Sequence, residues 1–508
     1  MSFISMEFLL FVLAAAFVYY IVPARYQWIV LLVFSYIFYA AAGVKLLFFL
    51  LFTTLTTYGT ARWIDAVNST DEDRKSKKIR KRRILIAGLL LNFGMLALLK
   101  YSNFTITNFN ALFHKNFALL NLALPLGISF YTFQSMGYLI DVYWGRFRAE
   151  KNPFRFALFV SFFPQLLQGP IGRFDKLAHQ FFEEHSFDLI RVEHGLQRMM
   201  WGYFQKLVLA DRAGVIVTEV FGNYSDYHGM TIVAAVLMYS IQLYGDFSGG
   251  MDVVLGVAEI FGITLDENFR QPYFSISITD FWHRWHITLG TWMKDYIFYP
   301  ISLSHWMNRF GKITKKKFGK QTGRVIPVAL ANIIVFLVVG IWHGAAWKYL
   351  MYGFYNGALI ALANLLAPVN RCAFEVFHID DKSRAWHVFR ILRTFLLVNI
   401  SWYFDIAVSL GASFAMMRAT FRDFTFRTLT DGSLLNLGLA GKDFIILAFG
   451  CAVLFIVSVL RENGVNIRES LDRKPPAVRW CTYFALVLSL PVFGYILLGG
   501  GGFIYAQF

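Results

Sequence analysis

The sequence predicts an all-α, polytopic membrane protein. The chain has 508 residues, of which 57% are hydrophobic and 16% are charged, whereas soluble domains are about half apolar and about 25% charged. Several apolar windows approach the ~20 residues that cross a bilayer as a helix. The ~10-residue alternating segments of a transmembrane β-barrel do not occur. These observations exclude a disordered chain and a coiled coil.

About a dozen apolar segments are candidate spans. They are residues 6–22, 28–43, 46–58, 84–99, 124–142, 201–221, 231–261, 325–342, 350–366, 388–408, 444–459 and 478–498. The first segment has no basic region before it, so we expect an uncleaved helix rather than a secretory signal. No fixed-period repeat and no matching pair of broken helices is visible, which favours one domain over residues 1–508 and disfavours a transporter of inverted repeats.

Two further apolar segments, residues 154–167 and 281–303, are interrupted by proline, glutamine, histidine or arginine. Broken backbone at membrane depth is tolerated only where protein or a water-filled cavity covers it. We therefore expect both segments to be re-entrant or interfacial elements around a site.

Two basic clusters, within residues 74–83 and 309–324, predict the orientation. Short basic loops beside spans stay on the cytoplasmic side, so we expect both loops in the cytosol of a multi-pass plasma-membrane protein. Their simplest role is attraction to anionic membrane lipids. A second role is to attract a polyanionic donor such as a coenzyme A thioester. No nucleic-acid motif accompanies them, so nucleic-acid binding is not expected.

The first candidate for chemistry is His343, in the sequence GIWHGAAW at residues 340–347. Ionisable residues within a membrane are costly and therefore functional candidates. Asn332 lies eleven residues earlier, almost three helical turns, so it shares a face with His343. The simpler alternative is an interfacial histidine with a hydrogen-bond partner. The small residues after His343 would let a substrate or a second helix approach the backbone.

The second candidate is His286. Residues 280–296 are expected to form one amphipathic helix with a broad aromatic face. His286 falls among the aromatic residues of this face, where solubility does not require an imidazole, so it is a candidate for a functional role. The alternative to a functional role is a packed histidine with one backbone hydrogen-bond partner. Asp280 and Arg284 are four residues apart, so the simplest interpretation of both is an ion pair along the helix.

Two more polar patches occur in apolar surroundings. Asp246 and Asp252 lie in a long apolar stretch and are expected to join a buried hydrogen-bond network rather than to act as an acid and a base. Gln165, Gln168 and Arg173 accompany the proline and glycines of an unwound or re-entrant element. These three side chains are candidates to line a polar passage.

These four patches, with residues 124–143, resemble the membrane-bound O-acyltransferase family, most closely its alginate O-acetyltransferase branch. The patterns Trp-His-Gly-x-x-Trp and Arg-Trp-His-x-(Ser/Thr)-Leu are specific when they occur together in a polytopic chain. The resemblance covers a family core at residues 1–370 in order, and residues 371–508 add further transmembrane helices.

The resemblance implies a helical bundle with re-entrant or interfacial helices around a central funnel. His343 matches the family's essential histidine, and His286 matches the second histidine of shorter, carrier-protein-dependent relatives. The expected substrate-binding residues are Asn332, Trp342, Trp347, Arg284, Trp285, Asp246, Gln165, Gln168 and Arg173. His283 stands where arginine or asparagine is commoner, and Gly250 with Met251 replaces a Tyr-Ser pair, so the acceptor polymer is not specified.

The implied activity is O-acyl transfer from a cytosolic thioester, most simply acetyl-CoA as co-substrate, with no bound cofactor. The acceptor is a hydroxyl of an extracytoplasmic polysaccharide, such as alginate, another exopolysaccharide or a cell-wall glycan, or of a relay protein. Relatives often work with a secreted esterase-like partner. Metal-ligand spacings and a Gly-x-Ser-x-Gly elbow are not seen, and the three cysteines are scattered. Alternatives are a D-alanyl transferase fed by a carrier protein and a non-enzymatic lipid or sugar transporter.

Overall fold

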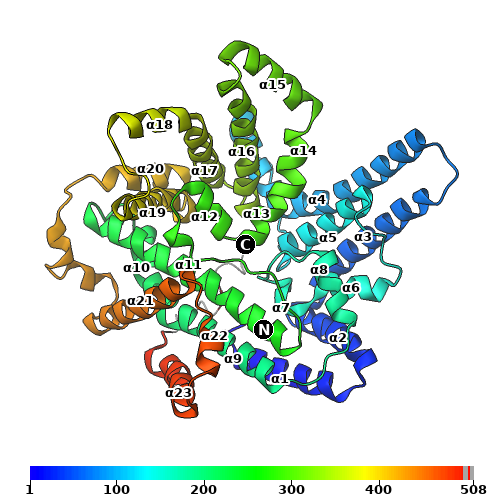
Figure 1. Cartoon of the computed structure of the whole chain (residues 1–508), viewed down its shortest axis with the longest axis horizontal. Helices are drawn as coiled ribbons and strands as arrows, with labels where there is room; N and C mark the ends of the chain where they lie inside the picture. Colours follow the sequence, from blue (N-terminus) through cyan, green and yellow to red (C-terminus); the bar gives the residue numbers. More distant parts are fainter. Residues whose placement is uncertain (496–501, 504–508) are drawn as a thin grey trace. The chain divides into compact units, whose positions relative to one another are not determined.

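The structure, a computed structural model, describes residues 1–495 together with Gly502 and Phe503. This part of the chain is built from helices, and its one β-feature is an isolated bridge between Phe269 and Trp285 (Figure 1). Six of the described helices are long and apolar enough to cross a membrane, or seven if a bent pair is one span. The prediction of an all-α polytopic protein is confirmed.

The chain divides into two compact units. Unit 1 consists of Met1–Phe204 and Asp246–Asp266 with Gly502 and Phe503, and unit 2 consists of Gln205–Gly245 and residues 267–495. The long helix α11 (Met230–Ile260) contributes its first half to unit 2 and its second half to unit 1. Helices that follow residue 370 belong to the same unit as the segments that carry both histidines.

Unit 1 contains the helices of the first 204 residues. These are α1 (Met6–Ile21), η1 (Ala24–Tyr26), α2 (Gln27–Ala40), η2 (Val44–Leu46), α3 (Leu47–Asn68), α4 (Arg74–Phe113), α5 (Ile128–Trp144), α6 (Pro153–Ser161), α7 (Phe163–Leu166), α8 (Phe174–Phe182) and α9 (Leu189–Tyr203). Helix α3 packs against α4 and α5. Residues 128–139 of α5 are buried on every side, as expected of a helix in a protein core.

Helices α9 and α11 approach each other closely through glycine. A Cβ at Gly195 would lie 2.7 Å from the Gly256 carbonyl oxygen, so neither position accepts a side chain without a shift of backbone. Near this contact Arg198 Nε lies 2.9 Å from Asp252 Oδ1. The expectation that Asp252 belongs to a structural network is confirmed by this buried ion pair.

Unit 2 contains the remaining elements, apart from Phe204 at the start of η3 and the second half of α11, which belong to unit 1. These are a π-helical segment η3 (Phe204–Ala210), α10 (Asp211–Gly222), η4 (Pro272–Phe274), α12 (Ile278–Arg284), α13 (Ile287–Met293), a π-helical segment η5 (Lys294–Phe298), α14 (Tyr299–Ser302), α15 (His305–Phe318), α16 (Thr322–His343), α17 (Trp347–Leu365), α18 (Ala367–Val376), α19 (Arg384–Ile406), α20 (Leu410–Ala419), η6 (Phe426–Leu429), η7 (Ser433–Leu437), α21 (Gly441–Glu462), α22 (Ile467–Asp472) and α23 (Pro476–Phe493).

Helices α16 and α17 form a hairpin whose backbones are in contact. A Cβ at Gly353 would lie 2.1 Å from the Phe336 carbonyl oxygen, and a Cβ at Gly340 would lie 2.2 Å from the Tyr349 carbonyl oxygen. Small residues drive such close packing between membrane helices because dispersion contacts replace a hydrophobic driving force. The small residues before His343 therefore serve a second helix.

Several expected segments differ from the helices that form. Residues 201–221 lie in uninterrupted helical backbone from Leu189 to Gly222, in which the π-helical segment η3 separates α9 from α10. A buried ion pair of 2.8 Å joins Lys206 in η3 to Asp211 at the start of α10. Residues 280–296 are not one helix: the chain breaks between α12 and α13 at His286. Residues 154–167 break at Phe162 between α6 and α7, and a re-entrant or interfacial position of this segment stays a prediction. The last predicted span reaches Leu498, which lies outside the described residues.

The basic clusters lie on helices rather than in loops, so that expectation was wrong. Residues 74–83 form the first turns of α4, whose N-terminus is capped by Asp73 through its carboxylate and the backbone N–H of Lys75 and Ser76. Most of the second cluster lies on α15. An N-cap carboxylate satisfies donors that have no partner within the helix. Exposure of both clusters to the cytosol stays a prediction.

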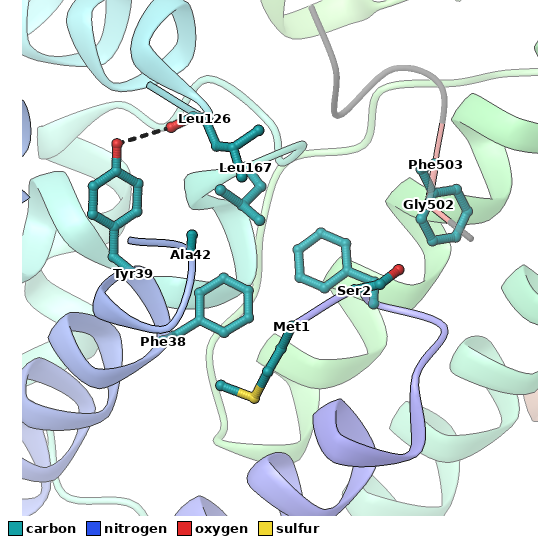
Figure 2. Close-up of a pocket in the computed structure, with 10 residues that line it drawn as sticks. Met1, Ser2, Phe38, Tyr39, Ala42, Leu126, Leu167, Gly502 and Phe503 are labelled. Atoms are coloured by element: carbon teal, nitrogen blue, oxygen red, sulfur yellow. Dashed lines mark hydrogen bonds between the residues drawn. The ribbon is translucent and has the colours of Figure 1, made fainter. Parts of the chain in front are cut away.

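Unit 1 also contains a pocket of about 270 Å³ (Figure 2). Its lining is mostly apolar and consists of Met1, Ser2, Phe3, Phe38, Tyr39, Ala42, Leu126, Leu167, Gly502 and Phe503. The Tyr39 hydroxyl donates to the Leu126 carbonyl oxygen at 3.0 Å. Neither histidine lines this pocket, so we assign no acyl chemistry to it.

We predict that Gly353→Ala lowers the unfolding temperature of the protein in detergent. The new methyl group would meet a backbone oxygen at 2.1 Å, and such overpacking costs about 1–3 kcal/mol. The matched control is Gly59→Ala on α3, where no atom lies within 4 Å of the new Cβ. Equal unfolding temperatures for the two variants would contradict the close α16–α17 contact.

Candidate active site

His286 occupies the turn that breaks the expected helix. Its backbone has φ 46°, in the left-handed region, and it precedes the first residue of α13. Non-glycine residues adopt this conformation infrequently, and such residues cluster at functional sites. The side chain is 2% exposed, although α12 and the uninterrupted helical run of α13, η5 and α14 (Ile287–Ser302) are both shorter than the ~20 residues that cross a membrane.

The turn is held by a neighbouring extended segment that begins at Asn268. The Arg270 N–H donates to the Arg284 carbonyl oxygen at 3.0 Å, and the Ile287 N–H donates to the Asn268 carbonyl oxygen at 3.1 Å. Phe269 and Trp285 form the antiparallel bridge between these two bonds. The backbone groups freed by the helix break therefore find partners within the protein, as a low-dielectric environment requires.

The Asn268 side chain is 1% exposed and makes three contacts through a single atom. Its Oδ1 accepts from the Thr288 N–H at 2.9 Å and from the Thr288 hydroxyl at 2.8 Å. The same oxygen lies 3.3 Å from Nδ1 of His286. Asn268 thus connects the left-handed turn, the imidazole and the first turn of α13.

His343 is the last residue of α16 and is 7% exposed. The imidazole packs among aromatic rings: its centroid lies 5.1 Å from that of Tyr352 and 6.1 Å from that of Tyr349, both on α17. A Cβ at Gly344 would lie 2.4 Å from the Tyr349 ring. The glycine after His343 is therefore required for this aromatic ring to approach.

The Trp342 ring packs against the imidazoles of both histidines. Its ring centroid lies 5.2 Å from that of His343 and 5.6 Å from that of His286. Burial and, secondarily, the charge of the neighbouring His343 imidazole hold the pKa of His286 well below its ordinary value, because a low dielectric and a like charge both disfavour the cation. A neutral imidazole accepts a proton, so this arrangement can support general-base chemistry.

Aromatic rings from α12, α17 and α19 surround these residues. Trp285 lies 5.7 Å from Trp402 between ring centroids, and Trp402 lies 6.2 Å from Tyr352. Trp282 donates its indole N–H to Asn356 Oδ1 at 3.2 Å. Trp402 therefore packs among the aromatic residues around the histidines, although it lies in the C-terminal part of the chain beyond residue 370.

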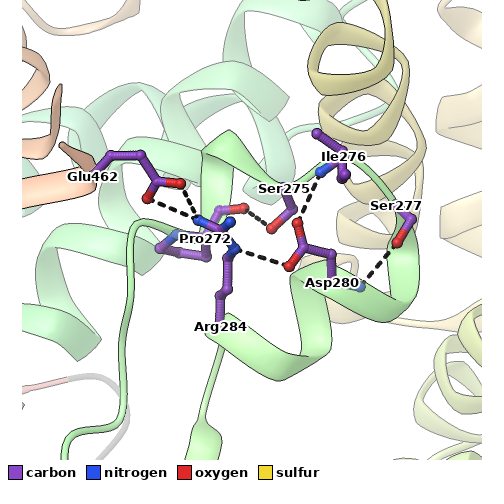
Figure 3. Close-up of polar contacts among 7 residues, drawn as sticks. All are labelled: Pro272, Ser275, Ile276, Ser277, Asp280, Arg284 and Glu462. Atoms are coloured by element: carbon purple, nitrogen blue, oxygen red, sulfur yellow. Dashed lines mark hydrogen bonds and ion pairs between the residues drawn. The ribbon is translucent and has the colours of Figure 1, made fainter. Parts of the chain in front are cut away.

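Arg284 is held by two carboxylates (Figure 3). Its Nε lies 2.9 Å from Asp280 Oδ1, and its Nη1 lies 2.9 Å from both carboxylate oxygens of Glu462. The expected pairing of Asp280 with Arg284 is confirmed. Asp280 also accepts from the Ile276 N–H at 3.0 Å. The network connects α12 to the C-terminal end of α21.

Lys348 anchors the segment that follows His343. Its Nζ donates to the backbone carbonyl oxygen of Asp405 at 2.8 Å, and the Tyr239 hydroxyl donates to Asp405 Oδ2 at 2.8 Å. Trp347 is 56% exposed, in contrast to Trp342. Asn332 is half-buried on the same continuous helix as His343, as its spacing predicted.

The other predicted site residues belong to unit 1. Gln165 Nε2 donates to Gln134 Oε1 at 3.2 Å, whereas both amide atoms of Gln168 have no hydrogen-bond partner in the described structure. A Cβ at Gly250 would lie 2.4 Å from Gln168 Nε2, so the absence of a side chain at this position makes room for the amide. Buried amides without protein partners are typical of sites that hold water or a polar ligand.

Asp246 is also in unit 1 and is 1% exposed, and Arg173 precedes α8 with intermediate exposure. The structure brings His286, His343, Trp285, Trp342 and Arg284 together within unit 2.

Sequence reasoning missed three residues of this site. Asn268 is an isolated polar residue in an irregular segment, and only its position opposite the broken turn reveals its role. Tyr352 and Glu462 are distant in sequence from the histidines. The spacing Trp347-x-Tyr349-x₂-Tyr352 offered one weak signal, because both tyrosines follow the small-residue turn on one helix.

Comparison with known proteins identifies the family. The MBOAT family model, membrane-bound O-acyltransferase, matches residues 150–313. The probable alginate O-acetylase AlgI of Azotobacter vinelandii is 33% identical over 428 residues, which are 83% of this chain and 78% of that protein. The peptidoglycan O-acetyltransferase of Helicobacter pylori is 32% identical over 365 residues, which are 66% of this chain and 64% of that protein.

A more limited similarity extends to the teichoic acid D-alanyltransferase of Bacillus subtilis, which is 29% identical over 264 residues, 49% of this chain and 62% of that protein. The family model includes His286 and ends before His343. The relatives named as O-acetylase and O-acetyltransferase support the same kind of reaction here. The chain belongs to the membrane-bound O-acyltransferase family, and it is a multi-pass membrane O-acyltransferase.

Proposed function

We propose that the protein transfers an acetyl group from cytosolic acetyl-CoA to a hydroxyl of an extracytoplasmic polysaccharide, or to a relay protein. The observation that supports this most is the pair of buried imidazoles that pack against Trp342, with ring centroids 5.2 and 5.6 Å from its own. The long similarity to a probable alginate O-acetylase favours acetyl over other acyl groups.

In the proposed reaction His343 is the general base. The imidazole takes the proton of the acceptor hydroxyl as the hydroxyl oxygen attacks the thioester carbonyl. The C–S bond then breaks, the new ester keeps the acetyl group, and the leaving thiolate receives the proton from the imidazolium. General-base catalysis of this kind contributes about 10²–10⁴-fold. The oxyanion would receive hydrogen bonds from Asn332 or from the backbone N–H groups that follow His343. His286 would accept a proton or a hydrogen bond in the same reaction.

The proposed substrate contacts are assigned to each unit separately, unit 2 being the one that carries the histidines. Trp285, Trp342 and Trp347 supply apolar surface for the acyl thioester, and the polar residues supply hydrogen bonds. The polar substrate-binding set comprises Asn332, Asp246, Gln165, Gln168 and Arg173. Arg284, which pairs with Asp280 and Glu462, is assigned to the support of the helix before His286. In support, Gln168 offers two buried amide atoms that no described protein group occupies.

The surroundings of the protein complete the proposal. The basic helical segments on α4 and α15 would face the cytosol, where they attract anionic lipids and the phosphates of coenzyme A. A polysaccharide outside the membrane would accept the acetyl group, and a separate secreted, esterase-like protein would relay it where the polymer is not reached directly.

The donor is tested with purified protein in lipid nanodiscs. We would supply radiolabelled acetyl-CoA, or a D-alanyl carrier protein, with an alginate or peptidoglycan fragment as acceptor. Acetyl transfer from free acetyl-CoA supports the proposal. Transfer only from the carrier protein would replace it with the reaction named for the Bacillus subtilis relative, and movement of sugar without thioester cleavage would indicate transport.

We predict that His343→Ala abolishes acyl transfer while the protein stays folded and inserted, because the variant lacks the base. The readout is label transferred from acetyl-CoA, with detergent size-exclusion chromatography as the test of folding. His305→Ala is the matched control, since His305 is exposed on α15 and should keep normal turnover. A normally inserted His343→Ala protein that still acetylates would remove His343 from the chemistry.

We predict that His286→Ala lowers kcat by at least 10-fold, a conservative share of the 10²–10⁴-fold expected of a positioned proton-transfer group. The measurement is steady-state acetyl transfer over a range of acetyl-CoA concentrations. Near-normal kcat in this variant would make His286 a packing residue.

We predict that Glu462→Gln and Arg284→Gln lower kcat by similar, few-fold factors. The Arg284 guanidinium is occupied by Glu462 and Asp280, and a partly exposed ion pair contributes about 0.2–1 kcal/mol. Both variants would loosen the helix that leads into His286. A raised KM in Arg284→Gln alone would instead indicate that Arg284 contacts substrate.

A further inference from the structure

The orientation of the Asn268 amide is fixed by its partners. A backbone N–H can only donate, so the atom that faces the Thr288 N–H at 2.9 Å must be the carbonyl oxygen of the amide and not its nitrogen. The Thr288 hydroxyl, 2.8 Å away, donates to the same oxygen. Asn268 therefore presents an acceptor to every group on this side.

This orientation determines the protonation of the His286 ring. Nδ1 lies 3.3 Å from an atom that only accepts, so Nδ1 carries a proton. In a neutral imidazole the other nitrogen, Nε2, then carries the lone pair, because the hydrogen bond at one ring nitrogen sets the tautomer of the ring. The long distance is compatible with a contact that orients the ring while two shorter bonds hold the oxygen.

We propose that Asn268 is a positioning residue that holds His286 in the Nδ1–H tautomer, so that Nε2 accepts a proton or hydrogen bond during acyl transfer. This inference rests on the proposed function, in which His286 takes part in the reaction. It extends that function by naming the reacting atom of His286 and the residue that determines it. Thr288 supports the same arrangement by fixing the position of the Asn268 oxygen.

An amide suits this site better than a carboxylate would. Asn268 orients Nδ1 without adding charge, whereas an aspartate at the same position would stabilise the imidazolium and raise the pKa of His286. The other titratable groups around the turn act differently: His343, from α16, disfavours the cation, and Arg284, from α12, is held by Asp280 and Glu462. α13 contributes the uncharged Thr288.

The test compares pH profiles of kcat for acetyl transfer by the full-length protein in nanodiscs. In Asn268→Asp the carboxylate keeps the acceptor and raises the pKa of His286, so the loss of activity on the acid side should move to higher pH by about one to three units. Activity at alkaline pH should stay close to that of the natural sequence. A profile that coincides with that of the natural sequence would overturn the inference.

A second variant, Asn268→Leu, removes the acceptor. Loss of tautomer control should lower kcat by a factor of at least about 10, with little change in KM. The upper limit is the factor of about 10⁴ by which kcat falls when a catalytic histidine is held in the wrong tautomer. Unchanged kcat in a folded Asn268→Leu protein would also overturn the inference. If this variant fails to fold, the pH profile of Asn268→Asp still decides the question.

The matched control is Asn399→Asp on α19. Asn399 is 6% exposed, and its Oδ1 accepts from the Ser240 hydroxyl at 2.9 Å. The same substitution there should leave the acid limb of the profile in place; an equal shift in both variants would show a general effect of buried charge and overturn the inference.

His286→Ala separates the two proposals. Full activity in His286→Ala would refute the role of His286 itself. An inactive His286→Ala protein, combined with an unshifted Asn268→Asp profile, would refute the role of Asn268 alone.

Discussion

A helix that breaks within an apolar segment exposes backbone N–H and C=O groups, and the remainder of the candidate active site depends on how these groups are satisfied. Water that competes for such groups is scarce in a membrane protein's interior, so partners must come from the chain. The segment from Asn268 to Arg270 supplies them through two backbone bonds and a β-bridge. The break can then present His286 from a left-handed turn, which a continuous helix would not do.

The second requirement of the site is an environment that excludes water and still brings the two imidazoles near each other. Aromatic rings provide it: Trp342 packs against both histidines, and Tyr352 packs against His343. Glycine makes this possible, because Gly340 and Gly353 let α16 and α17 touch through their backbones. The same burial keeps His286 neutral and hence able to accept a proton. Packing and chemistry are thus set by the same residues.

The helices after residue 370 take part in this arrangement. Trp402 on α19 packs against Trp285, and Glu462 at the end of α21 pairs with Arg284. Helices α19 and α21 thus each contact the segment that carries His286. These contacts make the C-terminal helices supports of the candidate active site, in the same unit as the histidine-bearing segments.

The sequence by itself determined the all-α membrane fold, the family, the two interrupted segments and both histidines, because apolar runs and a Trp-His-Gly motif are local signals. It placed the Asp280–Arg284 pair correctly, since i,i+4 spacing is a property of one helix. It gave residues 280–296 as a single helix and left Asn268, Tyr352 and Glu462 unnoticed. Only the tertiary structure decided these points, because a helix break is stable only when distant residues satisfy its backbone, and periodicity within one segment carries no information about them.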